Sequence, residues 1–406
     1  MTNVLFIHQN YPGQYRRLSN HLLGLPDFRV AAIGQKHAPG LPGVMMANYN
    51  YDAPQGKSEN PFMRELDNAM FNGKGALESL ALLRKNGFEP DIVFAHPAWG
   101  ESIFIKDALP KVPLIHFCEF FYRYEGADCC FDPEFPLGSS ETETRMRVRQ
   151  RNALHLLNID ACDLGISPTR WQKSVFPQEY HPKIRVLHEG IDVETLAPPA
   201  KPELKLPDGR VLTAEDEVIT YVSRNLEPYR GFHIFMRAVA EIQRRRPNAH
   251  VVLAGGDDVS YGRRLPPPET WRERMLKEVA VDPARTHFLG VVPYATYKSI
   301  LHVSSAHVYL TYPFVLSWSM LEAMAAGCLL IGSDTAPVRE VITDGKNGLL
   351  VDFFSVQGIA DRVDEIFAHP DRMAAIRKAA REHVAHRYDV RDSIAAYRAL
   401  IHEFVV

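Results

Sequence analysis

The sequence predicts an α/β protein with two domains, each built on a doubly wound parallel sheet. Its 406 residues exceed what one core usually holds, so two cores of roughly 150–200 residues are expected. Short apolar runs alternate with segments of helical spacing, which is typical of sheets covered by helices on both faces. Polar residues or glycine follow most of these runs, at the edge where open parallel sheets place their ligands.

Composition narrows the class of protein further. A formal net charge of -3 excludes a whole-protein attraction to nucleic acid or to anionic membranes, so only a local patch can contact a membrane. The five cysteines are odd in number and include no C-x-x-C pair, which indicates neither a disulfide framework nor a zinc site. The first apolar run is too short for a signal peptide. We therefore expect a cytoplasmic protein without a transmembrane segment, and peripheral contact with the cytoplasmic membrane stays open.

The first domain begins with a predicted strand at residues 4–8, a turn at 9–14 and a helix at 15–25. A loop of this kind, here with Gly13, can present backbone N–H groups to an anion or a sugar. The alternative is an ordinary βα turn without a ligand. Another strand is expected at 29–34. Residues 36–75 are rich in Gly, Pro and Asn without a clear period, so we predict a long surface segment, for which acceptor binding is one interpretation.

Two later strands are followed by residues that point to a ligand. The strand at 91–95 ends at His96, and a histidine there is either structural or a ligand-edge group. The strand at 113–117 leads to Glu119 and the aromatic run ending at Tyr122, which either stacks on a sugar or forms a packed loop.

The remainder of the first domain is predicted from capping and composition. Residues 125–152 read as an insertion, whose alternating Arg145, Arg147, Arg149 and Arg151 form either a solvated helix or a basic contact for an anionic acceptor or lipid headgroup. Strands at 161–166 and 184–187 flank a helix capped at 167–169. Residues 193–216 are rich in proline and charge, so the interdomain linker is placed there.

The second domain opens with a strand at 218–222, after which Arg224 and Arg230 stand six residues apart. Two cations at the end of a strand can clamp a diphosphate, and arginine adds bidentate geometry. A helix at 232–245, a strand at 250–254, an exposed helix near 269–279 and a strand at 287–290 are expected next.

The stretch 308–332 is predicted as strand, loop, helix and strand. Pro313 argues against a membrane helix there, and Gly327 ends the short helix predicted at 318–326. The N–H groups near Ser317 and Ser319 would direct a helix dipole at a phosphate. Glu322 is a carboxylate in an apolar helix, which is costly unless something binds it.

Several motifs resemble one known family. Residues 321–327 read LEAMAAG, and a strand, the run Pro337-Val338-Arg339-Glu340 and the run GKNGLLV at 345–351 follow. This resembles the C-terminal signature of the family 4 glycosyltransferases, retaining enzymes with the GT-B fold. The resemblance implies two Rossmann-like domains facing a central cleft, at 1–192 on the acceptor side and 217–386 on the nucleotide-sugar side. Residues 193–216 would be the linker, and a final helix at 387–406 would return to the first domain.

The resemblance also implies roles for individual residues. The family motif G-R-L-x-x-x-K-G maps onto 223–231, with Arg230 in place of the lysine. The family's ribose-binding glutamate maps to Glu322, and the glutamate eight positions before it falls on Phe314, which cannot accept a hydrogen bond. The implied sets are as follows: catalytic His96, Arg224 and Arg230; donor nucleotide Gly13, Arg224, Arg230, Val292, Ser317, Trp318, Ser319 and Glu322; donor sugar Phe314, Val315 and Leu316; acceptor Gln14, Glu119 and Tyr122.

The predicted function is a retaining, metal-independent glycosyltransferase of the hexosyltransferase type. It would move a sugar from a UDP- or GDP-sugar to a hydroxyl acceptor in glycan or glycoconjugate biosynthesis, without cofactor. No Asp-x-Asp occurs in the chain, which argues against the metal-dependent glycosyltransferase design. Two alternatives stay open: a sugar-nucleotide epimerase or hydrolase on the same fold, and a non-catalytic protein that binds nucleotide sugars.

Overall fold

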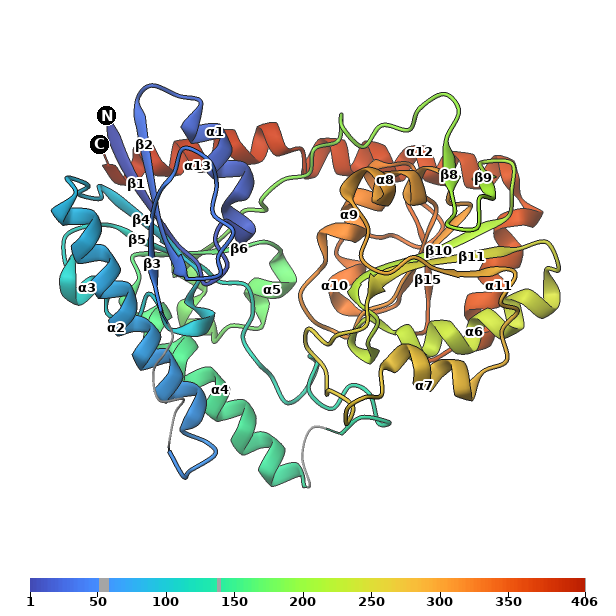
Figure 1. The fold of residues 1–406 in the computed structure, drawn as a ribbon, viewed down its shortest axis with the longest axis horizontal. Helices are drawn as coiled ribbons and strands as arrows, with labels where there is room; N and C mark the ends of the chain where they lie inside the picture. The colour runs from blue at the N-terminus through green and yellow to red at the C-terminus, as the bar shows by residue number, and fades with distance from the viewer. Residues whose placement is uncertain (51–57, 137–139, 406) are drawn as a thin grey trace. The chain divides into compact units, whose positions relative to one another are not determined.

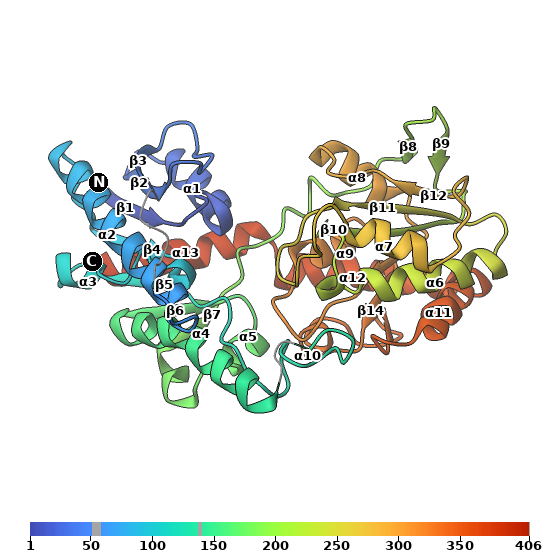
Figure 2. The same cartoon turned by 60° about the horizontal axis from the view of Figure 1, so that its bottom comes forward.

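A computed structural model describes residues 1–50, 58–136 and 140–405, and these form two compact units. Unit 1 comprises Met1–Gly190 and Val390–Val406, and unit 2 comprises Ile191–Asp389. Each unit contains a parallel sheet with helices on both faces (Figures 1 and 2). The predicted α/β class with two parallel sheets is therefore confirmed.

The sheet of unit 1 has, within the described residues, seven parallel strands in the order β3-β2-β1-β4-β5-β6-β7. The strands are β1 (Thr2–Ile7), β2 (Phe28–Gln35), β3 (Met45–Tyr49), β4 (Ile92–Ala95), β5 (Leu114–Phe117), β6 (Leu164–Ser167) and β7 (Ile184–Val186). Because β1 pairs with both β2 and β4, the strand order reverses beside β1. The carboxyl ends of β1 and β4 therefore meet at a topological switch point, where such sheets bind ligands.

Helices cover both faces of this sheet. They are α1 (Arg16–Leu23), α2 (Arg64–Lys85), α3 (Ile105–Ala108), α4 (Glu141–Ala161), α5 (Arg170–Ser174) and α13 (Val390–Val405), with 3₁₀ turns η1 (Gly13–Tyr15), η2 (Pro97–Trp99) and η3 (Gln178–Lys183). Figure 1 shows α13 beside α1. The last helix belongs to unit 1 because Tyr397, Leu400 and Ile401 are buried with the apolar side chains of β1 and α1.

The sheet of unit 2 has, in the described chain, six parallel strands in the order β12-β11-β10-β13-β14-β15. They are β10 (Val218–Asn225), β11 (His250–Gly256), β12 (Thr286–Phe288), β13 (Ala306–Tyr309), β14 (Leu330–Ser333) and β15 (Leu349–Val351). The helices are η4 (Pro228–Arg230), α6 (Phe232–Arg245), α7 (Trp271–Glu278), α8 (Tyr294–His302), α9 (Trp318–Ala325), α10 (Ala336–Arg339), α11 (Val356–Ala368) and α12 (Pro370–Arg387). Here β10 pairs with both β11 and β13, so the switch point lies at their carboxyl ends.

The helices of unit 2 form two layers. Helix α6 packs against α7 and α11 (Figure 2), and α9 packs against α12. On the α9 side, Met320, Leu321 and Met324 are fully buried with Leu330 of the neighbouring strand. Burial of such side chains stabilises the fold by about 1.5–3 kcal/mol each.

Two stretches that the sequence predicted without regular elements contain strands or helix. Residues 36–75 are not one structureless segment, because β3 pairs with β2 and α2 begins at Arg64; residues 51–57 of this stretch lie outside the described residues. Residues 193–216, where the interdomain linker is predicted, are not wholly irregular. They contain the antiparallel hairpin of β8 (Glu203–Lys205) and β9 (Val211–Thr213), whose buried Leu204 and Leu212 pack on unit 2.

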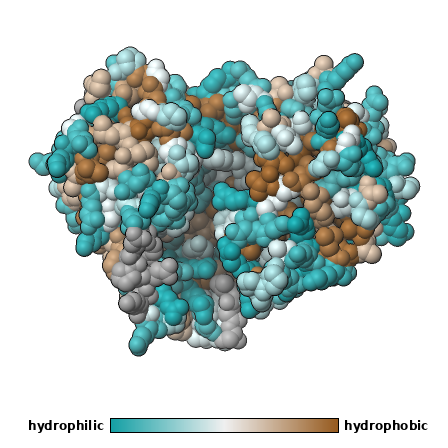
Figure 3. Space-filling model, viewed as in Figure 1, coloured by the Kyte–Doolittle hydropathy of each residue, from teal (hydrophilic) through white to brown (hydrophobic). Residues whose placement is uncertain are grey.

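The stretch predicted as an insertion at 125–152 contains the start of α4. Ser140 caps that helix by accepting a hydrogen bond from the N–H of Glu143, and residues 137–139 lie outside the described residues. No helix in the described ranges is both long enough and apolar enough to cross a membrane. The face in Figure 3 is mostly hydrophilic, with apolar groups in smaller clusters.

Candidate active site

A pocket in unit 2 lies at the switch point of its sheet. Its lining comes from the ends of β10 and β13, from η4, from the loop after β11 and from the start of α9. The polar lining residues are Tyr221, Ser223, Arg224, Asn225, Glu227, Arg230, Ser260, Tyr261, Tyr309, Ser317 and Ser319. The structure thus brings together two predicted arginines and two predicted serines from segments almost a hundred residues apart.

Arg230 is buried at the floor of this pocket. Its Nη1 donates hydrogen bonds to Thr311 Oγ1 at 2.7 Å and to the Val315 carbonyl at 3.0 Å, with the Tyr309 hydroxyl at 3.4 Å. Burial would lower the pKa of Arg230, but the neighbouring Tyr309 and Tyr261 outweigh it and the pKa is raised. The guanidinium therefore stays cationic in a site that shields it from water, where its charge acts strongly on an anion.

The backbone after Arg230 explains how it reaches that position. Gly231 has φ +71°, and a Cβ there would lie 2.3 Å from the Cβ of Leu310. Only glycine allows η4 to approach the end of β13 this closely. The close approach places Arg230 against Thr311 and Val315.

Arg224 lies on the exposed rim of the same pocket. The pairing of β10 with β11 is irregular between Val222 and Asn225. The motif G-R-L-x-x-x-K-G places its arginine five residues before its lysine, which is the position of Asn225 relative to Arg230. The predicted alignment of Arg224 with the motif arginine is therefore shifted by one residue, and Asn225 instead binds Ser260 Oγ through Nδ2 at 2.8 Å.

Glu227 closes the pocket by holding a loop, a role that the sequence did not indicate. Its carboxylate, on a side chain that is 1% exposed, accepts hydrogen bonds from the N–H groups of Ser260, Tyr261 and Gly262 at 2.8–3.3 Å. The loop in turn places the ring of Tyr261 5.3 Å from the guanidinium carbon of Arg230. This distance allows a cation–π interaction.

The first turn of α9 supplies the opposite wall. Ser317 caps the helix by accepting from the Ser319 N–H at 3.3 Å, and the Ser317 N–H donates to the Tyr309 hydroxyl at 2.9 Å. The positive end of the helix dipole therefore faces the pocket that contains Arg230. Trp318 differs from the prediction, because its side chain packs against the core of unit 2 and does not line the pocket.

Glu322 lies one turn further along α9 and is buried. Its carboxylate accepts from the hydroxyl of Tyr297 at 2.9 Å and is 3.5 Å from the hydroxyl of Tyr294. Burial and the adjacent carboxylate raise the pKa of Tyr297 well above its ordinary value, so it remains a donor. The two tyrosines stand at i and i+3 on α8, a spacing that puts both on one helix face.

The residues predicted at the donor sugar do not line the pocket. Phe314 is buried with its ring edge-on to Tyr261 at 4.9 Å and to Tyr229 at 5.3 Å. Val315 contributes its carbonyl to Arg230, and Leu316 belongs to the apolar core. The apolar ring of Phe314 thus packs against the loop that contains Tyr261. Val292, predicted at the nucleobase, likewise packs against the apolar cluster beneath the β8–β9 hairpin.

A second constellation lies at the switch point of unit 1. His8 follows β1 and His96 follows β4, and their ring centroids are 5.3 Å apart. His96 Nε2 is 3.3 Å from Glu119 Oε2, Gln14 Nε2 donates to Glu119 Oε1 at 3.0 Å, and His8 Nε2 is 2.7 Å from Gln14 Oε1. The structure thus unites His96, Gln14 and Glu119, which were predicted separately.

Two further predicted residues are Gly13, which supports the cluster, and Tyr122, which lies outside it. Gly13 has φ +45°, and a Cβ there would lie 2.4 Å from His8 Nε2, so the glycine makes room for the histidine ring. Tyr122 does not join the cluster. Its ring faces Arg151 at 5.1 Å and its backbone binds Asn152.

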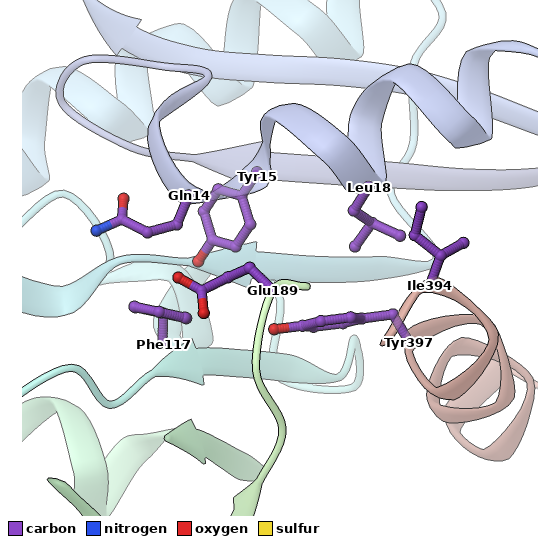
Figure 4. Close-up of a pocket in the computed structure, with 7 residues that line it drawn as sticks. All are labelled: Gln14, Tyr15, Leu18, Phe117, Glu189, Ile394 and Tyr397. Atoms are coloured by element: carbon purple, nitrogen blue, oxygen red, sulfur yellow. The ribbon is translucent and has the colours of Figure 1, made fainter. Parts of the chain in front are cut away.

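A small pocket borders the other side of Gln14 (Figure 4). It is lined by Gln14, Tyr15, Leu18, Phe117, Glu189, Ile394 and Tyr397. Figure 4 shows the carboxylate of Glu189 between the ends of the Tyr15 and Tyr397 side chains. Burial raises the pKa of both tyrosines well above the ordinary value, and the Glu189 charge adds to this rise. The pocket therefore lies between Gln14, at the ligand edge of the sheet, and helix α13.

Three of the four predicted arginines of α4 lie beside carboxylates. Arg145 pairs with Glu141 and Glu125, and Arg147 pairs with Glu143. Arg151 lies 3.9 Å from Glu65. These pairings support the solvated-helix interpretation.

Comparison with known proteins identifies the family. Residues 26–196 match the profile of the Glycosyl transferase family 4 group, and residues 208–383 match that of Glycosyl transferases group 1. The chain is a family 4 glycosyltransferase. A D-inositol 3-phosphate glycosyltransferase of Kribbella flavida is 24% identical over 375 residues, covering 88% of this chain and 81% of that enzyme.

A second relative matches over a shorter length. It is the GDP-mannose-dependent alpha-(1-6)-phosphatidylinositol monomannoside mannosyltransferase of Mycolicibacterium smegmatis, which is 26% identical over 250 residues. The match spans 57% of this chain and 59% of that enzyme.

Solved structures confirm the GT-B fold of this glycosyltransferase. Sucrose-phosphate synthase from Thermosynechococcus elongatus superposes with a TM-score of 0.72 at 15% identity, covering 99% of both chains. The Anabaena protein HepE in complex with UDP gives a TM-score of 0.67 at 15% identity, covering 99% of this chain and 100% of that one.

Proposed function

We propose that this glycosyltransferase is a retaining, metal-independent enzyme that moves a sugar from a UDP- or GDP-sugar to a hydroxyl acceptor in glycan or glycoconjugate biosynthesis. The observation that carries the proposal is the pocket of unit 2. There a buried, anchored Arg230, the rim residue Arg224 and the start of α9 all face one space. A nucleoside diphosphate carries the negative charge that these groups are suited to bind.

The chemistry requires stabilisation of the departing diphosphate. The bond between the anomeric carbon and the diphosphate oxygen breaks, and the acceptor oxygen forms a new bond to the same carbon. The acceptor proton passes to the departing diphosphate oxygen, so a front-face reaction needs no side-chain nucleophile. Arg230 and the N–H groups at the start of α9 then stabilise the charge that develops on the leaving group. Retention of anomeric configuration follows from attack on the same face.

Two features of unit 2 support nucleotide binding beyond the diphosphate. Glu322 presents a carboxylate held by Tyr297 one turn from Ser319, which suits two ribose hydroxyls. Tyr294 stands beside it with half of its surface exposed, and its ring can stack on a base. Arginine and helix dipole supply the positive charge that a metal ion would otherwise provide, which supports the metal-independent proposal.

The donor is left as a UDP- or GDP-sugar because relatives and neighbours differ. The M. smegmatis relative is named as GDP-mannose-dependent, whereas HepE was solved with UDP and with UDP-glucose. A thermal-shift panel of UDP, GDP, ADP, TDP and their sugar conjugates tests the proposal directly, since a ligand of the folded state raises the melting temperature. A shift with one diphosphate and its sugar conjugate supports it.

Two further measurements test the finer points. Nuclear magnetic resonance of the product reports whether the anomeric configuration is retained, and turnover in excess EDTA reports whether a metal is needed. Absence of any nucleotide shift with folded protein at millimolar ligand refutes the donor site. Release of free sugar or of an epimer, in place of transfer, would favour the hydrolase or epimerase alternative.

A further inference from the structure

Two series of hydrogen bonds in unit 1 end on the carboxylate of Glu119. In each series, every group donates a hydrogen bond to the next. In the first series, the Asn10 N–H donates to His8 Nδ1 at 2.9 Å, which leaves the ring proton on Nε2. His8 Nε2 can then only donate to Gln14 Oε1, and this fixes the amide so that Gln14 Nε2 donates to Glu119 Oε1. The donor and the acceptor of every hydrogen bond in this first series are therefore determined.

The second series reaches Glu119 from the neighbouring strand. The Ala98 N–H lies 3.3 Å from His96 Nδ1, so the proton of this ring is also on Nε2 and points to Glu119 Oε2 at 3.3 Å. Each Glu119 oxygen thus receives one donor and keeps a second lone pair. About 30% of the Glu119 side chain is exposed, so a ligand can approach this residue.

The Glu119 carboxylate lies beside two histidine rings in this site. Burial, together with the neighbouring His96, lowers the pKa of His8 to about 3, so the His8 ring is neutral. Burial would raise the pKa of Glu119, but the hydrogen bond and the electrostatic interaction with His96, followed by the hydrogen bond from Gln14, outweigh burial and the pKa is lowered. In the described part of the chain, no lysine or arginine binds the Glu119 carboxylate.

The side chains of the described cluster therefore offer accepting positions that no lysine or arginine occupies. A hydroxyl group can donate to the open lone pairs of Glu119, and one carboxylate can accept from two neighbouring hydroxyls. A phosphate brings only acceptors and a like charge, which a carboxylate repels. Next to the carboxylate, the half-buried Trp99 stacks on His96 with ring centroids 4.6 Å apart, and provides an apolar surface of the kind that binds sugar rings.

We propose that Glu119 forms the acceptor subsite of this glycosyltransferase and selects an uncharged, hydroxyl-rich acceptor, a sugar or polyol, over a phosphorylated one. The inference rests on the proposed transferase function and goes beyond it by naming the acceptor class. It also separates this chain from the K. flavida and M. smegmatis relatives, whose names specify inositol 3-phosphate and a phosphatidylinositol mannoside.

The test compares matched acceptor pairs that differ only in a phosphate. Nucleotide release is measured with the donor that gives the largest thermal shift, and with glucose against glucose 6-phosphate and myo-inositol against D-inositol 3-phosphate. We expect the wild type to show at least about a 10-fold higher kcat/KM for an uncharged member than for its phosphorylated partner. Glu119→Gln should lower kcat/KM for the uncharged acceptor by about 10- to 100-fold, because it removes hydrogen bonds to a charged group.

Two variants serve as controls. Glu119→Asp keeps the charge and should keep the preference for the uncharged member of each pair. Glu89→Gln removes a carboxylate that pairs with Arg84 just before β4, at the opposite end of the strand from His96, and should leave both kcat/KM values unchanged. The thermal shift with nucleotide, measured on every variant, reports whether the protein is folded and the donor site intact.

The outcomes separate the two proposals. A preference for the phosphorylated partner, an unchanged ratio in Glu119→Gln, or no transfer to either member of the pairs overturns the acceptor inference while the nucleotide shift persists. Loss of the nucleotide shift in the wild type would refute the donor site instead. A preference for the uncharged partner that falls toward equality in Glu119→Gln supports the inference.

Discussion

Replacing Arg230 with methionine should abolish most of the affinity for a nucleoside diphosphate. Methionine keeps an apolar stem of similar length against Tyr261 and Phe314, but it removes the cation and its donors. A hydrogen bond to a charged group contributes about 1.5–3 kcal/mol, and a unit charge 4 Å away contributes up to about 4 kcal/mol at an effective dielectric constant of 20. We therefore expect a loss of about 3 kcal/mol, which is about 150-fold in Kd.

The same substitution should also destabilise the fold. Thr311 Oγ1 and the Val315 carbonyl both lose their donor, and Thr311 is fully buried. An unsatisfied buried polar group costs about 1–3 kcal/mol, so the melting temperature should fall by several degrees. Arg230→Lys should lie between wild type and methionine, because it keeps the charge but loses the planar guanidinium that can bind a diphosphate through two donors.

Isothermal titration of UDP and GDP measures the affinity, and circular dichroism confirms that each variant is folded. Arg244→Ala is the matched control, since Arg244 lies on α6 with 69% of its side chain exposed and pairs with Glu241. It should change neither nucleotide affinity nor stability by more than about 0.5 kcal/mol. If Arg230→Met remains folded and binds both nucleotides within threefold of wild type, the assignment of this pocket to the diphosphate is refuted.

Three further predictions concern other parts of the molecule. Glu322→Ala should weaken UDP or GDP binding at least about 10-fold but leave pyrophosphate binding intact, because pyrophosphate has no ribose; equal losses in calorimetry would contradict this. Glu227→Gln should destabilise the protein by about 1–3 kcal/mol in urea unfolding and raise the donor KM, and an unchanged KM would show that the 260–262 loop does not serve the donor site. Burial lowers the pKa of His116 to about 3 in the folded state, whereas the pKa is near 6.5 in the unfolded state. Between these two pH values the unfolded state binds more protons than the folded state. The free energy of unfolding therefore falls as the pH falls below 6.5. His116→Leu should therefore recover about 2 kcal/mol at pH 5, measured by urea unfolding at pH 7 and pH 5, whereas the exposed His386→Gln should not.

Several elements were predictable because their signal is local. The apolar runs of β1, β4, β10, β11 and β13 are short and continuous, as expected for strands buried on both faces. Helix α6 combines a helical period with a preceding glycine and begins and ends where the sequence predicts. The placement of Arg224, Arg230, Ser317 and Ser319 at one site followed from their positions after strands, since parallel strands all end at the same edge.

Other elements escaped prediction because their stability comes from distant partners. Strand β3 is a five-residue edge strand that pairs with β2. Apolar and polar residues alternate only weakly in its own sequence. The part of α2 before Ala76 contains Asn68, Asn72, Gly73 and Gly75, which weaken its helical period. Both segments are held by packing on the sheet, and this contribution is absent from local propensity.

The sequence by itself determined the chemical inventory of this protein: two parallel-sheet domains, two arginines and a helix start at the sheet edge of the second, and a histidine and a glutamate at that of the first. The tertiary structure alone decided how these groups are used. It joined Gln14 to Glu119 across 105 positions and tied Glu227 to the loop at 260–262. It also turned Phe314 toward Tyr261 and away from the pocket lining. Such pairings depend on which strand ends lie side by side, and that order is set by the packing of the whole sheet.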